Sequence, residues 1–147
     1  MQNEKFNEKI GFMREKIIVV SNDYGILDTI ASILEARDYS VIKESSKDGI
    51  FDALVKLGLQ GNPANKIFLD FDTPGLADME LLRLLKESSP TLDIIIMTRE
   101  SVLPEMATHL KAANMPIMGK PFGYGELLAF FKNPAQRFAT AQQSQSV

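Results

Sequence analysis

Short apolar runs alternate with amphipathic stretches along most of this chain, and this alternation constrains the fold more than any other feature of the sequence. The apolar runs have the length of strands, recur at intervals of roughly 25 residues and lie at 17–20, 39–44, 66–70, 94–97 and 115–118. The stretches after them predict helices near 26–34, 47–59, 78–86, 102–113 and 123–132. Strands and helices that alternate in this way predict right-handed crossovers and a parallel sheet.

The predicted strands differ in how far they can be buried, and this difference predicts their order. The first, third and fourth are apolar on both faces and suit the inside of a sheet. The second mixes apolar and polar residues, and the fifth contains Pro116, which lacks the N–H that a central strand donates. We therefore expect an α/β fold with strand order 2-1-3-4-5 and helices on both faces of the sheet.

Side-chain spacing also predicts how the helices begin and which residues they bury. Asp23 and Asp78 are the expected N-caps of the first and third helices. The residues expected to be buried include Ile50, Phe51, Leu54, Val55 and Leu57 in the second helix and Leu103, Met106 and Leu110 in the fourth.

Chemically active side chains follow the strands at the edge where parallel sheets bind ligands. The third strand ends at Asp70, Asp72 follows it, and Pro74-Gly75 then turns the chain away. Polar residues also stand at the carboxyl ends of the other inner strands and after the fifth, at Ser21-Asn22-Asp23, Thr98 and Lys120-Pro121. Because these ends meet at one edge of the sheet, we expect the side chains to lie close together.

Composition excludes several classes of function. The net charge is -3 and no cluster of Lys and Arg occurs, which argues against a nucleic-acid surface. The chain has no cysteine, so it forms neither disulfides nor thiolate metal sites. No apolar run approaches the roughly 20 residues that cross a membrane, and the N-terminus lacks the apolar core of a signal peptide. We expect a soluble cytoplasmic protein without membrane contact.

The set formed by Asp70, Pro74, Thr98 and the Lys-Pro-Phe of 120–122 resembles the receiver domain of bacterial response regulators. The resemblance covers about residues 16–132. It implies a flavodoxin-like receiver fold that serves in phosphorelay, or two-component, signal transduction. In that family the aspartate at the end of the third strand takes a phosphoryl group from a histidine kinase or a phosphotransfer protein, with Mg²⁺ bound beside it.

Carried onto this chain, the resemblance makes Asp70 the phosphoacceptor. It implies that Thr98 donates a hydroxyl hydrogen bond to a phosphoryl oxygen and that Lys120 supplies a positive charge. It further implies a cis Lys120–Pro121 bond and a position for Asp72 where relatives offer a backbone carbonyl to the metal.

Three departures from the family pattern stand out. Relatives carry two adjacent acidic residues where this chain has Ser21 and Asn22, and Asp23 comes one position late. We therefore expect a weakened Mg²⁺ site formed by Asn22, Asp70 and Asp72. Arg99 stands where a small residue normally follows the threonine, where it would either shield the acceptor or pair with it. Ile117 replaces a frequent aromatic residue.

Two other functions fit parts of the sequence. A receiver fold that binds partners without phosphorylation, a pseudo-receiver, is favoured by the Ser21-Asn22 pair. A phosphatase of the haloacid dehalogenase type is suggested by Asp70-Phe71-Asp72, although Pro74 stands where that family has Thr or Val.

Residues 1–15 are expected to form an N-terminal extension and residues 133–147 a flexible tail. Because so few residues follow the last predicted helix, we expect no effector domain. The resemblance to a receiver domain further implies that the chain is not an enzyme. Output would then pass to a downstream protein through the surface of the 102–113 helix, the 115–118 strand and the 123–132 helix. A second copy of the chain, forming a homodimer, is a further partner that we consider.

Overall fold

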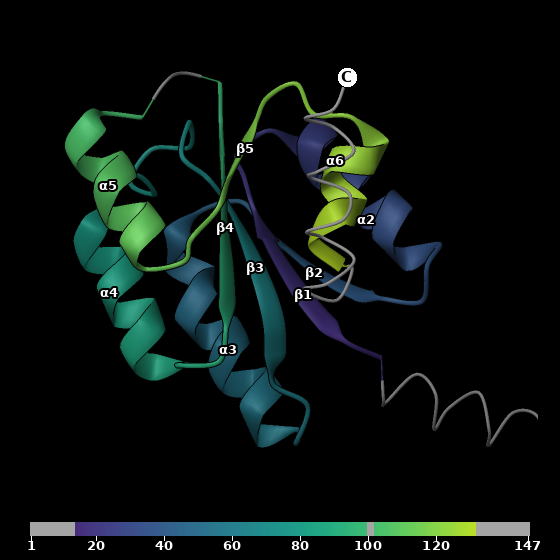
Figure 1. Cartoon of the computed structure of the whole chain (residues 1–147). Helices are drawn as coiled ribbons and strands as arrows, with labels where there is room; N and C mark the ends of the chain where they lie inside the picture. Colours follow the sequence, from purple (N-terminus) through teal and green to yellow (C-terminus); the bar gives the residue numbers. More distant parts are fainter. Residues whose placement is uncertain (1–13, 100–101, 132–147) are drawn as a thin grey trace, which may run out of the picture.

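The computed structural model describes residues 14–99 and 102–131, and the site discussed below is taken from these residues (Figure 1). The expected tail at 133–147 lies outside the described residues, as does the expected extension at 1–15 apart from its last two positions.

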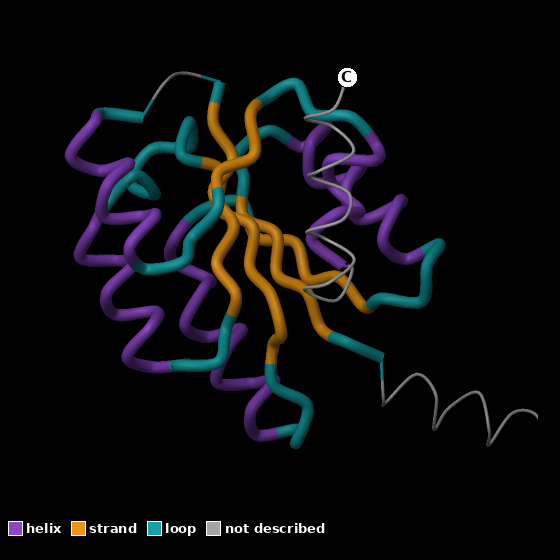
Figure 2. Tube along the Cα trace, in the orientation of Figure 1, coloured by secondary structure: helices purple, strands orange, loops and turns teal. Residues whose placement is uncertain are grey.

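Five parallel strands form one sheet in the order β2-β1-β3-β4-β5, which confirms the predicted fold class and strand order. The strands are β1 (Lys16–Val20), β2 (Ser40–Glu44), β3 (Ala64–Asp70), β4 (Asp93–Thr98) and β5 (Ile117–Gly119). The sheet lies between two layers of helices (Figures 1 and 2). On one face are α2 (Tyr24–Glu35) and α6 (Tyr124–Leu128) with the 3-10 turn η2 (Ala129–Phe131). On the other are η1 (Lys47–Gly49), α3 (Ile50–Leu59), α4 (Met79–Ser88) and α5 (Pro104–Ala112).

The strands divide the core because successive side chains point to opposite faces. Ile18, Val20, Ile67 and Leu69 pack with α3, α4 and α5. Their neighbours in the same strands, such as Ile17, Val19 and Phe68, pack with α2 and α6. Phe68 also meets the rings of Phe130 and Phe131, which ties η2 to the sheet. The inner strands are therefore fixed from both sides, and their carboxyl ends are held in place.

Several predicted boundaries were wrong by a few residues. The fifth strand begins at Ile117 rather than at Met115, because the Met115 N–H still donates to Leu110 O at the end of α5. The fourth helix begins at Pro104, a residue whose missing N–H and fixed φ suit the first helical position. The second helix starts as the turn η1, and the last helix ends at Leu128 before η2.

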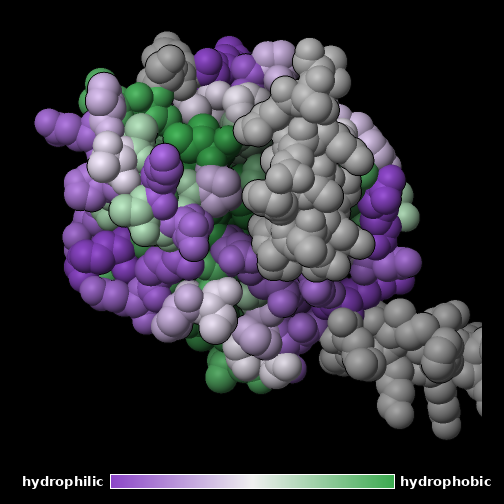
Figure 3. Space-filling model, in the orientation of Figure 1, coloured by the Kyte–Doolittle hydropathy of each residue, from purple (hydrophilic) through white to green (hydrophobic). Residues whose placement is uncertain are grey.

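Two residues predicted to be buried are instead exposed. Val55 is 59% exposed because it lies about 140° around α3 from the buried Ile50. Leu103 is 73% exposed because it is the extended residue before α5 and does not belong to the helix. Elsewhere Figure 3 shows polar side chains over much of the visible surface. Among the described residues, no helix is both long enough and apolar enough to cross a membrane.

Candidate functional site

The carboxyl ends of four strands bring the predicted site residues together. Asp70 is the last residue of β3, and Ser21 directly follows β1. Thr98 is the last residue of β4, and Lys120 follows β5. The sequence-based expectation that these ends converge is confirmed by the contacts between them.

Asp70 is buried and accepts hydrogen bonds at both carboxylate oxygens. Its Oδ1 accepts from Lys120 Nζ at 2.7 Å and from the Asp72 N–H at 3.0 Å. Its Oδ2 accepts from Ser21 Oγ at 2.7 Å. Ser21 is completely buried and also accepts from the Asp23 N–H at 3.0 Å. The serine hydroxyl thus stands against the acceptor at a position where the resemblance leads one to expect a carboxylate.

Lys120 lies between two carboxylates. Its Nζ is 2.7 Å from Asp70 Oδ1 and 2.7 Å from Asp72 Oδ2, and its side chain is only 5% exposed. Burial by itself would lower the pKa of Lys120, but hydrogen bonds and charge from Asp70 and Asp72 outweigh it and raise that pKa. Lys120 is therefore a fixed cation at this end of the sheet. The Lys120–Pro121 bond is cis, as the resemblance implied.

Asp72 points its carboxylate back into the site. Besides Lys120 Nζ, its Oδ2 accepts from the Arg99 N–H at 3.0 Å, and its Oδ1 accepts from Thr98 Oγ1 at 3.5 Å. Burial would raise the pKa of Asp72, but the hydrogen bonds from Lys120 and the Arg99 backbone, with the nearby positive charges, lower it. Asp72 is therefore held as an anion, and the donors that hold it are Lys120, Arg99 and Thr98, which the sequence had not suggested.

Asn22 and Asp23, the two residues after Ser21, bind other groups than Asp70. Asn22 and Thr73 are joined twice, because the Asn22 N–H donates to Thr73 Oγ1 at 2.9 Å and this hydroxyl donates to Asn22 Oδ1 at 3.3 Å. Asp23 caps α2 by accepting from the Gly25 and Ile26 N–H groups. This confirms the predicted cap, as the Glu80 N–H bond confirms Asp78. Sequence inspection missed Thr73, which is buried beside these residues.

The expected Mg²⁺ ligands do not fit a metal ion in the arrangement that the structure shows. Mg²⁺ needs oxygen atoms directed at one point. The carboxylates of Asp70 and Asp72 do converge, but on the ammonium group of Lys120. The side-chain oxygen of Asn22 is turned to Thr73 instead. Within residues 14–99 and 102–131, no three His, Cys, Asp or Glu side chains gather as a metal-binding group.

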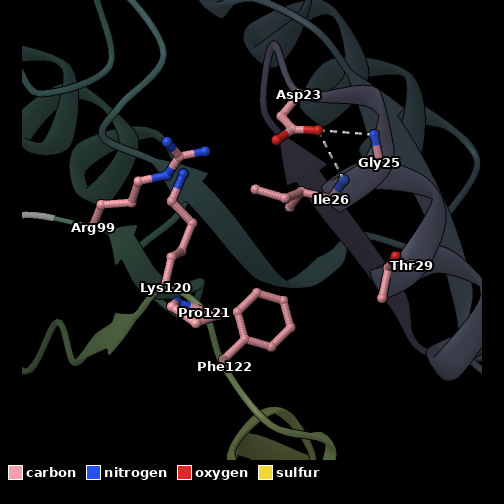
Figure 4. Close-up of a pocket in the computed structure, with 8 residues that line it drawn as sticks. All are labelled: Asp23, Gly25, Ile26, Thr29, Arg99, Lys120, Pro121 and Phe122. Carbon is pink, nitrogen blue, oxygen red and sulfur yellow. Dashed lines mark hydrogen bonds between the residues drawn. The ribbon is translucent and has the colours of Figure 1, made fainter.

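A cleft of about 550 Å³ adjoins the site between α2 and the chain that follows β5. Its lining residues are Asp23, Gly25, Ile26, Thr29, Arg99, Lys120, Pro121 and Phe122. Figure 4 shows the side chains of Arg99 and Lys120 side by side and Asp23 across from them. The expected pairing of Arg99 with Asp70 is wrong, because the ion pair that Asp70 forms among the described residues is with Lys120. That Arg99 shields the acceptor stays a prediction. Positive charge thus lines one side of the approach to the site.

Known proteins resemble this chain over most of its length. A family model described as response regulator receiver domain matches residues 17–132. Response regulator MprA of Mycobacterium sp. (strain KMS) is 30% identical over 117 residues, which are 80% of this chain and 49% of that protein. The transcriptional regulatory protein YkoG of Bacillus subtilis is 31% identical over 77% of this chain and 47% of its own length. The chain therefore spans about half the length of the curated relatives it matches.

Solved structures show the same fold. A CheY-like response regulator receiver domain protein from Methanospirillum hungatei superposes with a TM-score of 0.67 and 21% identity, covering 91% of this chain and 99% of that one. The BeF3-activated DrrB receiver domain gives a TM-score of 0.65 and 24% identity, covering 80% of this chain and 94% of that chain.

Proposed function

The chain belongs to the response regulator receiver family of two-component systems, and on that premise we propose that it accepts a phosphoryl group on Asp70. The observation that carries the proposal is the position of this carboxylate. It is buried at the carboxyl end of a central strand, bound to Lys120, with the hydroxyl of Thr98 at the end of the adjacent strand. Membership of the family does not favour the phosphatase alternative, which we do not pursue.

The transfer would proceed by attack of a carboxylate oxygen of Asp70 on phosphorus. A bond forms between that oxygen and phosphorus while the bond from phosphorus to the donor nitrogen breaks, and the electron pair of the broken bond stays with the nitrogen. The product is an acyl phosphate. Catalysis of such a transfer is positioning together with neutralisation of the phosphoryl oxygens. Lys120 Nζ, the N–H groups of Asp72 and Arg99 and the Thr98 hydroxyl are the donors within reach of that chemistry.

The donor in this proposal is a histidine kinase or a phosphotransfer protein. Receiver domains typically bind Mg²⁺ through acidic residues, and Asn22, Asp70 and Asp72 are the oxygen donors that this chain offers. In the arrangement shown these oxygens are engaged with Lys120 and Thr73, so a metal ion would have to displace those contacts. We therefore propose that binding of the metal is weak, and we assign it no step. The protein signals by contact rather than by turnover, and the face of α5, β5 and α6 is the proposed surface for a downstream protein or a second copy of the chain.

A pseudo-receiver that acts without phosphorylation is the second candidate. The observation that favours it is that both oxygens of Asp70 already accept hydrogen bonds, one of them from Ser21 in place of an acidic residue. In that case Asp70 would organise the site without reacting.

Exposure to a small phosphodonor, with and without millimolar Mg²⁺, separates the two candidates. Intact-mass measurement is expected to show one added phosphoryl group, and the Asp70→Asn variant is expected to show none. Asp93→Asn removes an equal charge at the opposite end of β4 and is expected to react like the unaltered protein. If intact mass shows no adduct, and the NMR signal of the Thr98 amide does not shift on treatment with the phosphodonor, the pseudo-receiver is favoured.

A further inference from the structure

The carboxylate of Asp72 makes contacts that suit a bound anion better than a surface side chain. Its oxygens accept from Lys120 Nζ at 2.7 Å, from the Arg99 N–H at 3.0 Å and from Thr98 Oγ1 at 3.5 Å. We call these three groups the three-donor site. They come from the ends of β4 and β5, whereas Asp72 follows β3. One carboxylate therefore joins three strand ends.

The three-donor site adjoins Asp70, because Lys120 Nζ belongs to it and also contacts the acceptor carboxylate. Lys120 Nζ is equally close to Asp70 Oδ1 and to Asp72 Oδ2. The Asp72 N–H donates to Asp70 Oδ1, so the backbone at Asp72 is fixed beside the acceptor. A phosphoryl group attached to Asp70 would therefore compete with the carboxylate of Asp72 for the same hydrogen-bond donors.

We propose that Asp72 is an internal anion that occupies the three-donor site in the unphosphorylated protein, in place of a phosphoryl group. It keeps Lys120, Thr98 and the Arg99 backbone engaged without phosphate, and it slows phosphorylation because the incoming group must displace it. The second part of this inference rests on the proposed function of Asp70, whereas the first part does not.

The loop that carries Asp72 is held in a way that supports this role. The Thr73 N–H donates to Asp70 O at 3.0 Å, and the Thr73 hydroxyl is joined to Asn22. Phe71 is bound through its N–H to Met97 O at 2.8 Å. Phe71 is therefore fixed to β4 and Thr73 to Asp70 and Asn22, which limits the freedom of the backbone that carries Asp72. That side chain is 31% exposed, so a small displacement would move it from the site into water.

Electrostatics gives the direction of the effect. A carboxylate on Lys120 uses part of the positive charge that phosphoryl oxygens require, and it repels an approaching phosphoryl group. Removal of this charge is therefore expected to favour the reaction at Asp70. If Asp72 served chiefly as a metal ligand, its removal would have the opposite effect.

The first test compares rates of phosphorylation. Asp72→Ala and Asp72→Asn are treated with a small phosphodonor, and adduct formation is followed by intact mass. We expect modification about ten-fold faster than in the unaltered protein, from the loss of one nearby charge. Glu35→Gln, which removes an equal charge from the far end of α2, should leave the rate unchanged. An equal or slower rate in both Asp72 variants overturns the inference.

The second test does not depend on phosphorylation. In the unmodified protein, Asp72→Ala is expected to move the Arg99 amide proton upfield and to speed its exchange with solvent, because its carboxylate acceptor is lost. The amide of Thr98 should shift as well. If no form of the protein takes a phosphoryl group, the proposed function fails and these signals alone decide whether Asp72 occupies the three-donor site. Unchanged Arg99 and Thr98 signals would refute it.

Discussion

Ser21→Ala gives a direct measure of how the acceptor carboxylate is stabilised. In the unaltered protein the hydroxyl of Ser21 donates to Asp70 Oδ2 at 2.7 Å, and both residues are almost completely buried. Alanine fits the same space but leaves Oδ2 without this donor. Water has little access to replace it, so the loss is expected to appear in the free energy of unfolding.

The size of this loss in free energy follows from the charge of Asp70 and the burial of Asp70 and Ser21. A hydrogen bond to a charged group contributes about 1.5–3 kcal/mol, more than one between neutral groups. The Asp23 N–H also loses an acceptor, but Asp23 is partly exposed and water can take that place at small cost. We therefore expect Ser21→Ala to lower the free energy of unfolding by about 2 kcal/mol. With a urea m-value near 2 kcal/mol/M, the midpoint falls by about 1 M.

Urea unfolding followed by circular dichroism measures this change, and a double-mutant cycle with Asp70→Asn assigns it. Asparagine keeps the shape of Asp70 but not its charge, so Ser21→Ala should cost about 1 kcal/mol less in that background. A loss below about 0.5 kcal/mol in the unaltered background would refute the assignment, since changes of that size are usual for uninvolved positions. A coupling energy near zero would refute it as well.

Three further changes test the site from other sides. Lys120→Met should lower the free energy of unfolding by about 3–5 kcal/mol, because two carboxylates then face each other unpaired, and adding Asp70→Asn should recover part of the loss in urea titrations. Burial would raise the pKa of Asp72, but the contacts with Lys120 and Arg99 lower it below its ordinary value of 3.8 in the folded protein. The ionised Asp72 therefore contributes fully to the free energy of unfolding above pH 3.8, and this contribution is lost as pH falls through the lower folded pKa. The unfolding difference between the unaltered protein and Asp72→Asn should accordingly be constant near neutral pH and shrink below about pH 4. Ser21→Asp combined with Asn22→Asp should lower the Tm without metal and restore it with millimolar Mg²⁺, whereas Mg²⁺ should change the Tm of the unaltered protein little.

Much of the fold was predictable because burial leaves a clear pattern in the sequence. Uninterrupted apolar runs mark inner strands, and Pro116 marks an edge, so the strand order follows. The convergence of Asp70, Thr98 and Lys120 was predictable for the same reason, since parallel strands end at one edge. The N-caps were also predictable because Asp23 and Asp78 bind backbone N–H groups only two or three residues away.

The rest depends on rotations that the sequence pattern does not specify. Val55 was placed on the wrong face of α3, because a helix dense in apolar residues allows more than one inward stripe. The direction of the Asp72 carboxylate was missed because it depends on donors more than 25 positions away, at Arg99 and Lys120. The hydrogen bond from Ser21 to Asp70 could have been predicted from one feature. Ser21 follows a strand that neighbours β3, so its short hydroxyl side chain lies within reach of the acceptor.

The charges at the site explain together why Ser21 and Asn22 follow β1 and why the carboxylate of Asp72 turns inward. With acidic residues at positions 21 and 22, four carboxylates would meet one ammonium group, and only a further cation would offset the excess. With Ser21 and Asn22 in those places, Asp70 and Asp72 share Lys120 and leave a net charge of -1. The remaining oxygens, Asp70 Oδ2 and Asp72 Oδ1, accept from the hydroxyls of Ser21 and Thr98, so this set of contacts is complete without a metal. The same balance explains why Asp72 can turn inward: an acidic pair at positions 21 and 22 would repel its carboxylate, whereas without that pair it accepts from Lys120, Arg99 and Thr98.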